Sequence, residues 1–114
     1  MTPVIYNDVV SAVAVVAAVP RDERVTVMSD LLWQAEQAEE HRLICCAVHP
    51  LFGDGSLMSA ALRHPGKGSV SFQTVDGLTA WLVVLTALRA WLLAAERSSC
   101  KAVQRKESAG SGEA

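Results

Sequence analysis

The stretch DERVTVMSDLLWQAEQAEEHRLICC, Asp22–Cys46, decides the fold class of this chain. Its apolar residues recur in steps of three and four, as one face of an α-helix requires. These residues are Val25, Met28, Leu31, Leu32, Ala35, Ala38, Leu43 and Ile44. The stretch therefore predicts a long helix, whose acidic first turn suits the helix dipole and whose opposite, polar face is solvated.

A second helix is predicted on the N-terminal side of this stretch. The run VVSAVAVVAAV, Val9–Val19, contains no turn residue and is long enough for three helical turns. Asn7 or Asp8 can cap its start. Pro20 either ends it, because proline cannot continue the hydrogen-bond ladder of a helix, or starts the next helix at a first-turn position.

On the C-terminal side, a long apolar helix begins after Thr74 or Asp76, either of which can cap it. Its predicted stripe comprises Leu78, Trp81, Leu82, Leu85, Leu88, Trp91 and Leu92. From Ser98 onward the residues are small, polar and charged, which predicts a disordered tail. We therefore expect a single helical domain over residues 1–97 and a disordered polar tail over residues 98–114.

Composition excludes some functions. The chain of 114 residues is 51% hydrophobic and 19% charged, which is typical of one globular domain. Its net charge of −2 offers no basic surface for nucleic acid. The first ten residues lack the basic region of a secretory signal, so we expect a cytoplasmic protein with reduced cysteines.

The last helix is also tested as a membrane span. Leu78–Ala95 would extend about 27 Å at ~1.5 Å per residue, just short of a hydrocarbon core of about 30 Å. Arg89 within it costs about 2.5–3.5 kcal/mol in lipid, which nearly cancels what the leucines and valines gain. A core helix of a soluble protein needs no such compromise, so a membrane partner is not expected; peripheral association remains an alternative.

The segment HPLFGDGSLM, His49–Met58, predicts a bend followed by a short helix from about Ser56 to Arg63. Pro50 interrupts the preceding helix, the glycines permit unusual backbone angles, and Asp54 or Ser56 can act as N-cap. The amides of such a helix start can also hold an anion. An alternative ligand site therefore comprises His49, Phe52, Asp54, Gly55 and Ser56. We favour the structural interpretation, because the lysine of a phosphate-binding loop is missing and Asp54 would repel an anion.

A metal site is a weaker alternative. His41, Cys45 and His49 fall at four-residue steps, and soft metals prefer such side chains. On a helix that persists to Pro50, the two histidines would lie about 12 Å apart, too far to share an ion. Only a pair such as Cys45 and His49 remains. The neighbouring glutamates lack the Glu-x-x-His pattern of di-metal bundles and predict a solvated acidic face.

Two segments also carry a resemblance. HPLFGDGSLMSAALRHP, residues 49–65, together with VPRDERVTVMSDLLWQAEQAEEHR upstream, is similar to a family of short, uncharacterised alphaproteobacterial proteins. The family's core is an HP-x-aromatic-GDGSLM segment that follows a long helix. The matching positions are His49, Pro50, Phe52, Gly53, Asp54, Gly55, Ser56, Leu57 and Met58. The resemblance covers about residues 3–65, implies no activity, and favours a stand-alone bacterial protein over a fragment.

Together these patterns predict an all-α fold, a small helical bundle of two long and one or two shorter helices. No pattern indicates a catalytic residue or a cofactor. The leading hypothesis is a non-catalytic adaptor or regulator that acts through protein–protein contacts. Trp33, Trp81 and Trp91 are its predicted interaction surface, and the apolar surplus favours a homo-oligomer. The alternatives are a ligand-binding or enzymatic role at the His49–Ser56 bend and peripheral membrane association through the last helix.

Overall fold

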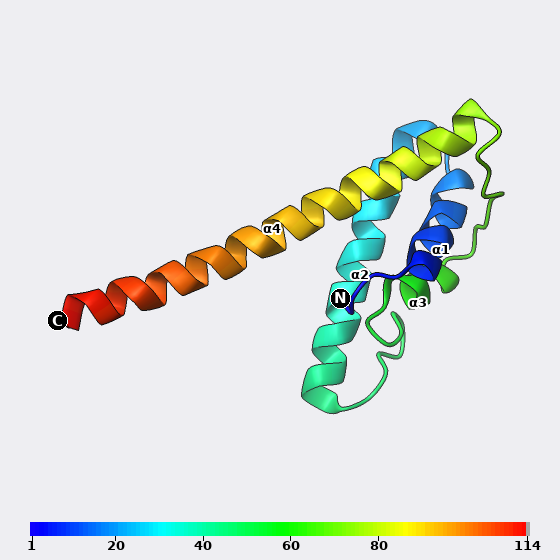
Figure 1. Ribbon diagram of the computed structural model, residues 1–114. Coiled ribbons are helices and arrows are strands. Elements are labelled where there is room, and N and C mark those ends of the chain that lie inside the picture. The colour runs from blue at the N-terminus through cyan, green and yellow to red at the C-terminus, as the bar shows by residue number, and fades with distance from the viewer. Residues whose placement is uncertain (114) are drawn as a thin grey trace.

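The computed structural model describes residues 1–113, with side chains for residues 1–98, and these residues form helices and no strands. The elements are α1 (Tyr6–Ala17), the 3-10 turn η1 (Arg21–Glu23), α2 (Arg24–Cys45), α3 (Leu57–Leu62) and α4 (Val75–Glu113). The predicted all-α class is confirmed. Figure 1 shows α2 and α4 diverging from one end of the molecule, with α1 and α3 packed beside them.

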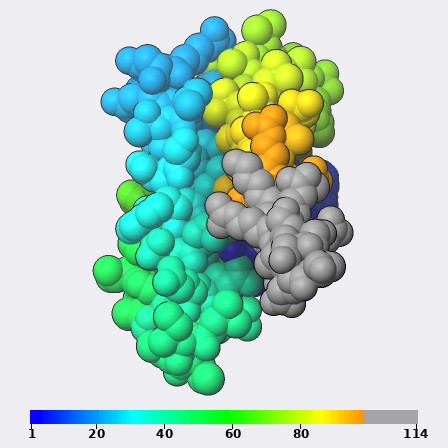
Figure 2. All heavy atoms as spheres, turned by 90° about the vertical axis from the view of Figure 1, so that its left-hand side faces the viewer, coloured from blue at the N-terminus to red at the C-terminus, as the bar shows by residue number. Residues whose placement is uncertain are grey.

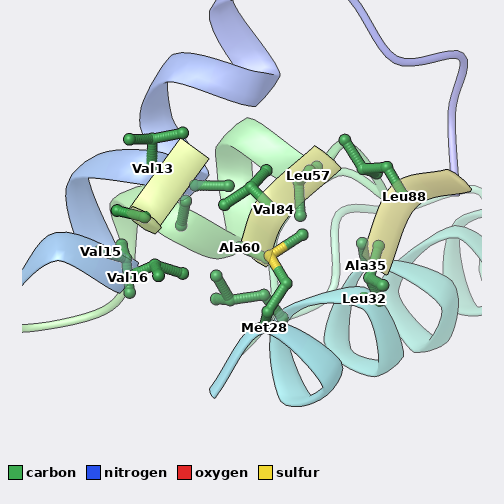
Figure 3. Packing of buried hydrophobic residues seen from close by; sticks show 14 of the residues in the cluster. Val13, Val15, Val16, Met28, Leu32, Ala35, Leu57, Ala60, Val84 and Leu88 are labelled. Carbon is green, nitrogen blue, oxygen red and sulfur yellow. The ribbon is translucent and has the colours of Figure 1, made fainter. Parts of the chain in front are cut away.

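The core is built mainly from aliphatic side chains of all four α-helices (Figure 3). Val13 and Val16 of α1, Met28 of α2, Leu57 of α3 and Val84 of α4 are fully buried. Alanines between them are also buried, so the helices approach closely. The many alanines and valines of the sequence therefore allow the helices to pack tightly in a bundle.

The start of α1 corrects a predicted cap. α1 begins at Tyr6, and its N-cap position is Ile5. Asp8 instead lies inside the first turn and is buried. One carboxylate oxygen accepts a hydrogen bond from Ile5 N–H at 2.9 Å, and the other accepts one from Met58 N–H at 2.9 Å. Asp8 thus joins the first turns of α1 and α3.

The apolar stripes are buried only in part. On α2, Val25, Leu43 and Ile44 are exposed, whereas the buried apolar residues are Met28, Leu31, Leu32, Ala35 and Ala38. On α4 the buried line is Ala80, Trp81, Val84 and Leu88. The remaining leucines of the predicted α4 stripe are exposed, namely Leu78, Leu82, Leu85 and Leu92. The helix is therefore apolar on more than the face that its own bundle covers.

A buried guanidinium joins three helix ends. Arg24 is 3% exposed. It donates to the carbonyl oxygens of Ala17 (3.5 Å), the last residue of α1, and of Val19 (3.0 Å). It also donates to the Asp76 carboxylate (3.1 Å) at the start of α4. Arg24 and Arg21 together hold the pKa of the Asp76 carboxyl below its usual value through these hydrogen bonds. Arg24 thereby fixes the point from which α2 and α4 diverge.

α4 contains one segment, Val75–Ser98, that is long and apolar enough to cross a membrane by length and composition alone. Core helices of soluble proteins meet the same criterion. α4 also continues to Glu113, past the predicted start of the tail at Ser98. From residue 99 onward the side chains lie outside the described residues, and the disordered tail stays a prediction.

Candidate functional site

The bend between α2 and α3 depends on two glycines. Gly53 and Gly55 have φ angles of +93° and +99°, in the region that favours glycine. A Cβ atom at Gly55 would lie 2.9 Å from the Cα of Glu39 on α2. The N-terminal segment also contacts the bend, where Thr2 N–H donates to the Gly55 carbonyl oxygen at 2.9 Å. The bend is therefore closely packed.

The side chains after Gly53 form a helix cap. Ser56 is the N-cap of α3, and its hydroxyl accepts a hydrogen bond from Ser59 N–H at 3.1 Å. Asp54 in turn accepts from the backbone N–H (2.9 Å) and the hydroxyl (2.7 Å) of Ser56. These two hydrogen bonds hold the pKa of the Asp54 carboxyl below its usual value. The predicted capping role of this segment is confirmed, with Ser56 as the cap.

His49 also has a structural contact, which reasoning from the sequence missed. Its Nδ1 accepts hydrogen bonds from Leu51 N–H (3.0 Å) and Phe52 N–H (3.1 Å). Its backbone pairs with Gly53 in both directions, and its ring stacks on Phe52 with ring centroids 4.6 Å apart. The imidazole therefore closes the turn that leads into the glycines.

His49→Ala is expected to destabilise the fold by about 1 kcal/mol, because two backbone donors in a partly exposed turn lose their acceptor. His49→Asn should restore part of the loss, since a side-chain amide oxygen can accept from the backbone two residues on. Urea unfolding followed by circular dichroism measures both variants. Equal stability of His49→Ala and the wild type would show that the imidazole does not hold the turn.

The predicted separation of the two histidines is wrong. α2 ends at Cys45, and Cys46 adopts a φ angle of +54°, so the chain turns back instead of continuing as helix. The rings of His41 and His49 consequently lie 4.9 Å apart, centroid to centroid. Even so, no group of three or more His, Cys, Asp or Glu side chains in the described part of the chain is arranged to hold a metal ion. The Cys45–His49 alternative lacks a third such ligand there.

An open groove lies elsewhere, between α2 and α4. Its volume is about 760 Å³. Its walls are Val25, Ser29, Leu32, Trp33 and Glu36 from α2, and Thr79, Leu82, Val83, Thr86, Ala87, Ala90 and Trp91 from α4. Figure 2 views this side of the molecule, with α2 in cyan beside α4 in yellow and orange. Most of these side chains are apolar, and this volume is within the range of ligand and peptide sites.

Two of the three predicted surface tryptophans line this groove. Trp33 is 56% exposed and Trp91 is half-buried. Trp33 also contacts the bend, because its ring meets the edge of Phe52 at a centroid distance of 5.7 Å. The bend therefore supports one wall of the groove, and the two candidate regions of the sequence are neighbours.

Trp81 is not on the interaction surface predicted from the sequence. It lies in the core, where Phe72 stacks on it at a centroid distance of 4.8 Å. Its indole Nε1 is buried and has no hydrogen-bond partner among the described residues. Sequence reasoning also missed Val83, Thr86 and Glu36 as groove residues. The available signal was that α4 is apolar nearly all round, which indicates a second covered face.

Comparison with protein families places the chain in a family whose function is unknown. No match was found among curated proteins or among solved structures. A domain of unknown function, DUF7742, matches residues 2–88. This match spans α1, α2, α3, the bend and most of the α4 wall of the groove. The chain belongs to the DUF7742 family.

Proposed function

We propose that this protein is a non-catalytic helical interaction protein, an adaptor or regulator, which binds an apolar helix of another polypeptide in the α2–α4 groove. The groove itself carries the proposal. It is long, open and apolar, and it is formed by two diverging helices. Amphipathic helices bind in grooves of this kind through side chains one helical turn apart.

The groove residues support a polypeptide partner. Tryptophan is enriched among the residues that dominate binding energy in protein interfaces, and here Trp33 and Trp91 line opposite walls. Hydroxyl groups of Ser29, Thr79 and Thr86 lie among the apolar side chains and can orient a bound helix. Two large apolar side chains of the groove, Val25 and Leu82, are 65% and 64% exposed and are available to a partner.

The ligand-binding alternative at the bend has less support. The polar groups of Asp54 and Ser56 are engaged in capping α3, and His49 Nδ1 holds the turn. The Asp54 carboxylate would also repel an anionic ligand. The bend acts instead as a support for Trp33 through Phe52.

The membrane alternative rests on the apolar character of Val75–Ser98. The neighbouring wall of α2, however, carries Glu36. A lipid surface that covered α4 and the groove would bring this carboxylate toward anionic headgroups, which repel it. A polypeptide partner in the cytoplasm of an alphaproteobacterium fits the groove better.

Leu82→Lys tests the proposal, because an ammonium group placed in an apolar groove must be desolvated when a helix binds. A photo-crosslinking amino acid at Thr86, in native cells, should attach to a polypeptide, and Leu82→Lys should reduce the crosslinked yield by about tenfold or more. Ile44→Lys is the matched control, since Ile44 is equally apolar and 73% exposed but lies outside the groove.

Two outcomes would contradict the proposal. One is a crosslink to lipid instead of polypeptide. The other is an equal yield of crosslinked polypeptide from the wild type and Leu82→Lys. Circular dichroism of both lysine variants confirms that they are folded.

A further inference from the structure

We propose that His49 is a proton-sensitive switch. When its imidazole takes up a proton, the turn that follows it opens, and Trp33 loses its support in the wall of the α2–α4 groove. The groove is the one assigned to the partner, so the biological use of the switch rests on the proposed function. The switch itself is a property of the unbound chain and operates without a partner.

The first observation is the protonation state that the turn requires of His49. Its Nδ1 accepts hydrogen bonds from Leu51 N–H at 3.0 Å and from Phe52 N–H at 3.1 Å. Because a backbone N–H can only donate, Nδ1 carries no proton in the closed turn and the ring is neutral. An imidazolium ring donates from both nitrogens, so its Nδ1–H would point at two other N–H groups. The protonated ring and the closed turn therefore exclude each other.

The second observation is a series of ring contacts that leads from this turn to the groove. The His49 ring stacks on Phe52 at a centroid distance of 4.6 Å and an interplanar angle of 13°. Phe52 meets the ring of Trp33 edge-on, at 5.7 Å and 71°. Trp33 is a wall residue of the groove. Loss of the Nδ1 acceptor frees the backbone of Phe52, and the ring that supports Trp33 moves with it.

Ionisable groups of α2 also face His49, across a hollow of about 210 Å³. They are Glu40, His41 and Cys45. The His41 ring lies edge-on to the His49 ring at a centroid distance of 4.9 Å. A charge on His41 would repel a charge on His49, whereas the Glu40 carboxylate attracts it. Within the bend, the Asp54 carboxylate is already held by the hydrogen bonds of the α3 cap. Since these charges act in opposite directions, the mechanism rests on the lost Nδ1 acceptor.

Fluorine NMR of the purified chain labelled with 5-fluorotryptophan tests the proposal. The chain contains three tryptophans, and Trp33→Phe identifies the resonance of Trp33. Imidazole side chains gain their proton between about pH 8 and about pH 5, and over this range the Trp33 resonance should shift in one protonation step. The resonance of Trp81, which lies in the core, should keep its position and show that the fold is intact.

His49→Asn should abolish the shift of the Trp33 resonance, because an amide oxygen can accept from the backbone two residues on and does not titrate. His64→Asn is the matched control. His64 Nδ1 also accepts from an N–H two residues on, that of Gly66 at 3.2 Å, but His64 follows α3 and is outside the series of rings that leads to Trp33. The shift should persist in His64→Asn. It should persist as well in His41→Asn, which removes the neighbouring imidazole.

A Trp33 resonance that does not move, or that moves equally in the wild type and His49→Asn, would overturn the proposal. A common transition of all tryptophan resonances would also overturn it, since that transition reports unfolding of the whole chain. If His49→Asn fails to fold, the wild type decides through the amide resonances of Leu51 and Phe52. A midpoint equal to that of Trp33 supports the proposal, and a different midpoint overturns it. None of these measurements involves a partner, so a failed crosslink at Thr86 would contradict the proposed function without changing their result.

Discussion

Gly55→Ala is expected to destabilise the protein by about 2–5 kcal/mol, through two independent effects. A φ angle of +99° in this region costs a side chain about 1–2 kcal/mol. The new methyl group would lie 2.9 Å from Glu39 Cα, on the backbone of α2, and such overpacking costs about 1–3 kcal/mol. Because a domain of this size is stable by only about 5–15 kcal/mol, the variant should lose much of its stability.

Gly66→Ala is the matched control for Gly55→Ala. Its Cβ atom would meet the Ala18 Cβ at 3.6 Å, an ordinary contact, and its φ angle is not in the positive region. The free energy of unfolding, measured in urea by circular dichroism, should be unchanged or slightly increased in this variant. If both alanine variants have the same stability, the bend is not packed against α2 as the structure shows.

Arg24→Met is expected to cost about 2–4 kcal/mol, although methionine retains most of the buried aliphatic volume. The loss arises because the carbonyl oxygens of Val19 and Ala17 lose charged donors in a buried place. Arg21→Met is the control. Arg21 contacts the same carboxylate of Asp76 at 3.1 Å but is 62% exposed, so its removal should change stability by less than about 1 kcal/mol.

The contact between Arg24 and Asp76 also makes the stability of the fold depend on pH. Because its arginine partners lower the pKa of Asp76 in the folded state, the stabilising contribution of this carboxylate is complete above its unfolded pKa. It is lost as the pH falls from about 4 through the lower folded value. The difference in stability between the wild type and Arg24→Met should therefore shrink on acidification. A constant difference down to the lowest accessible pH would contradict this account.

Local patterns predicted the elements well because their causes are local. The helix start at Ser56 depends on residues within three positions of it, and the middle of α2 carries its buried stripe where the spacing indicated. The bend between Pro50 and Ser56 was likewise expected from its glycines. In each case the physical reason, a cap, a period or a backbone angle, is contained in a few consecutive residues.

The contacts that set the arrangement of the helices were not predictable in this way. Arg24 binds Asp76 across 52 residues, and Asp8 binds Met58 across 50. Either residue, taken by its sequence neighbours alone, is typical of an exposed first turn. The burial of Trp81 and the exposure of Leu82 were also missed, because α4 is apolar on several faces and only its neighbours decide which one is covered. The groove forms beside a face of α4 that the neighbouring helices leave uncovered.

The carboxylate of Asp8 has a consequence for how the protein is made. Its hydrogen-bond donor on α3, Met58 N–H, is translated 50 residues later. At about 5–20 residues per second this delay lasts several seconds. During that interval the valine-rich segment of α1 has neither α3 nor α4 to cover it. Each nascent chain therefore carries an unpaired, aggregation-prone helix on the ribosome until its second half emerges, and its yield in the cell should depend on the chaperones that hold it there.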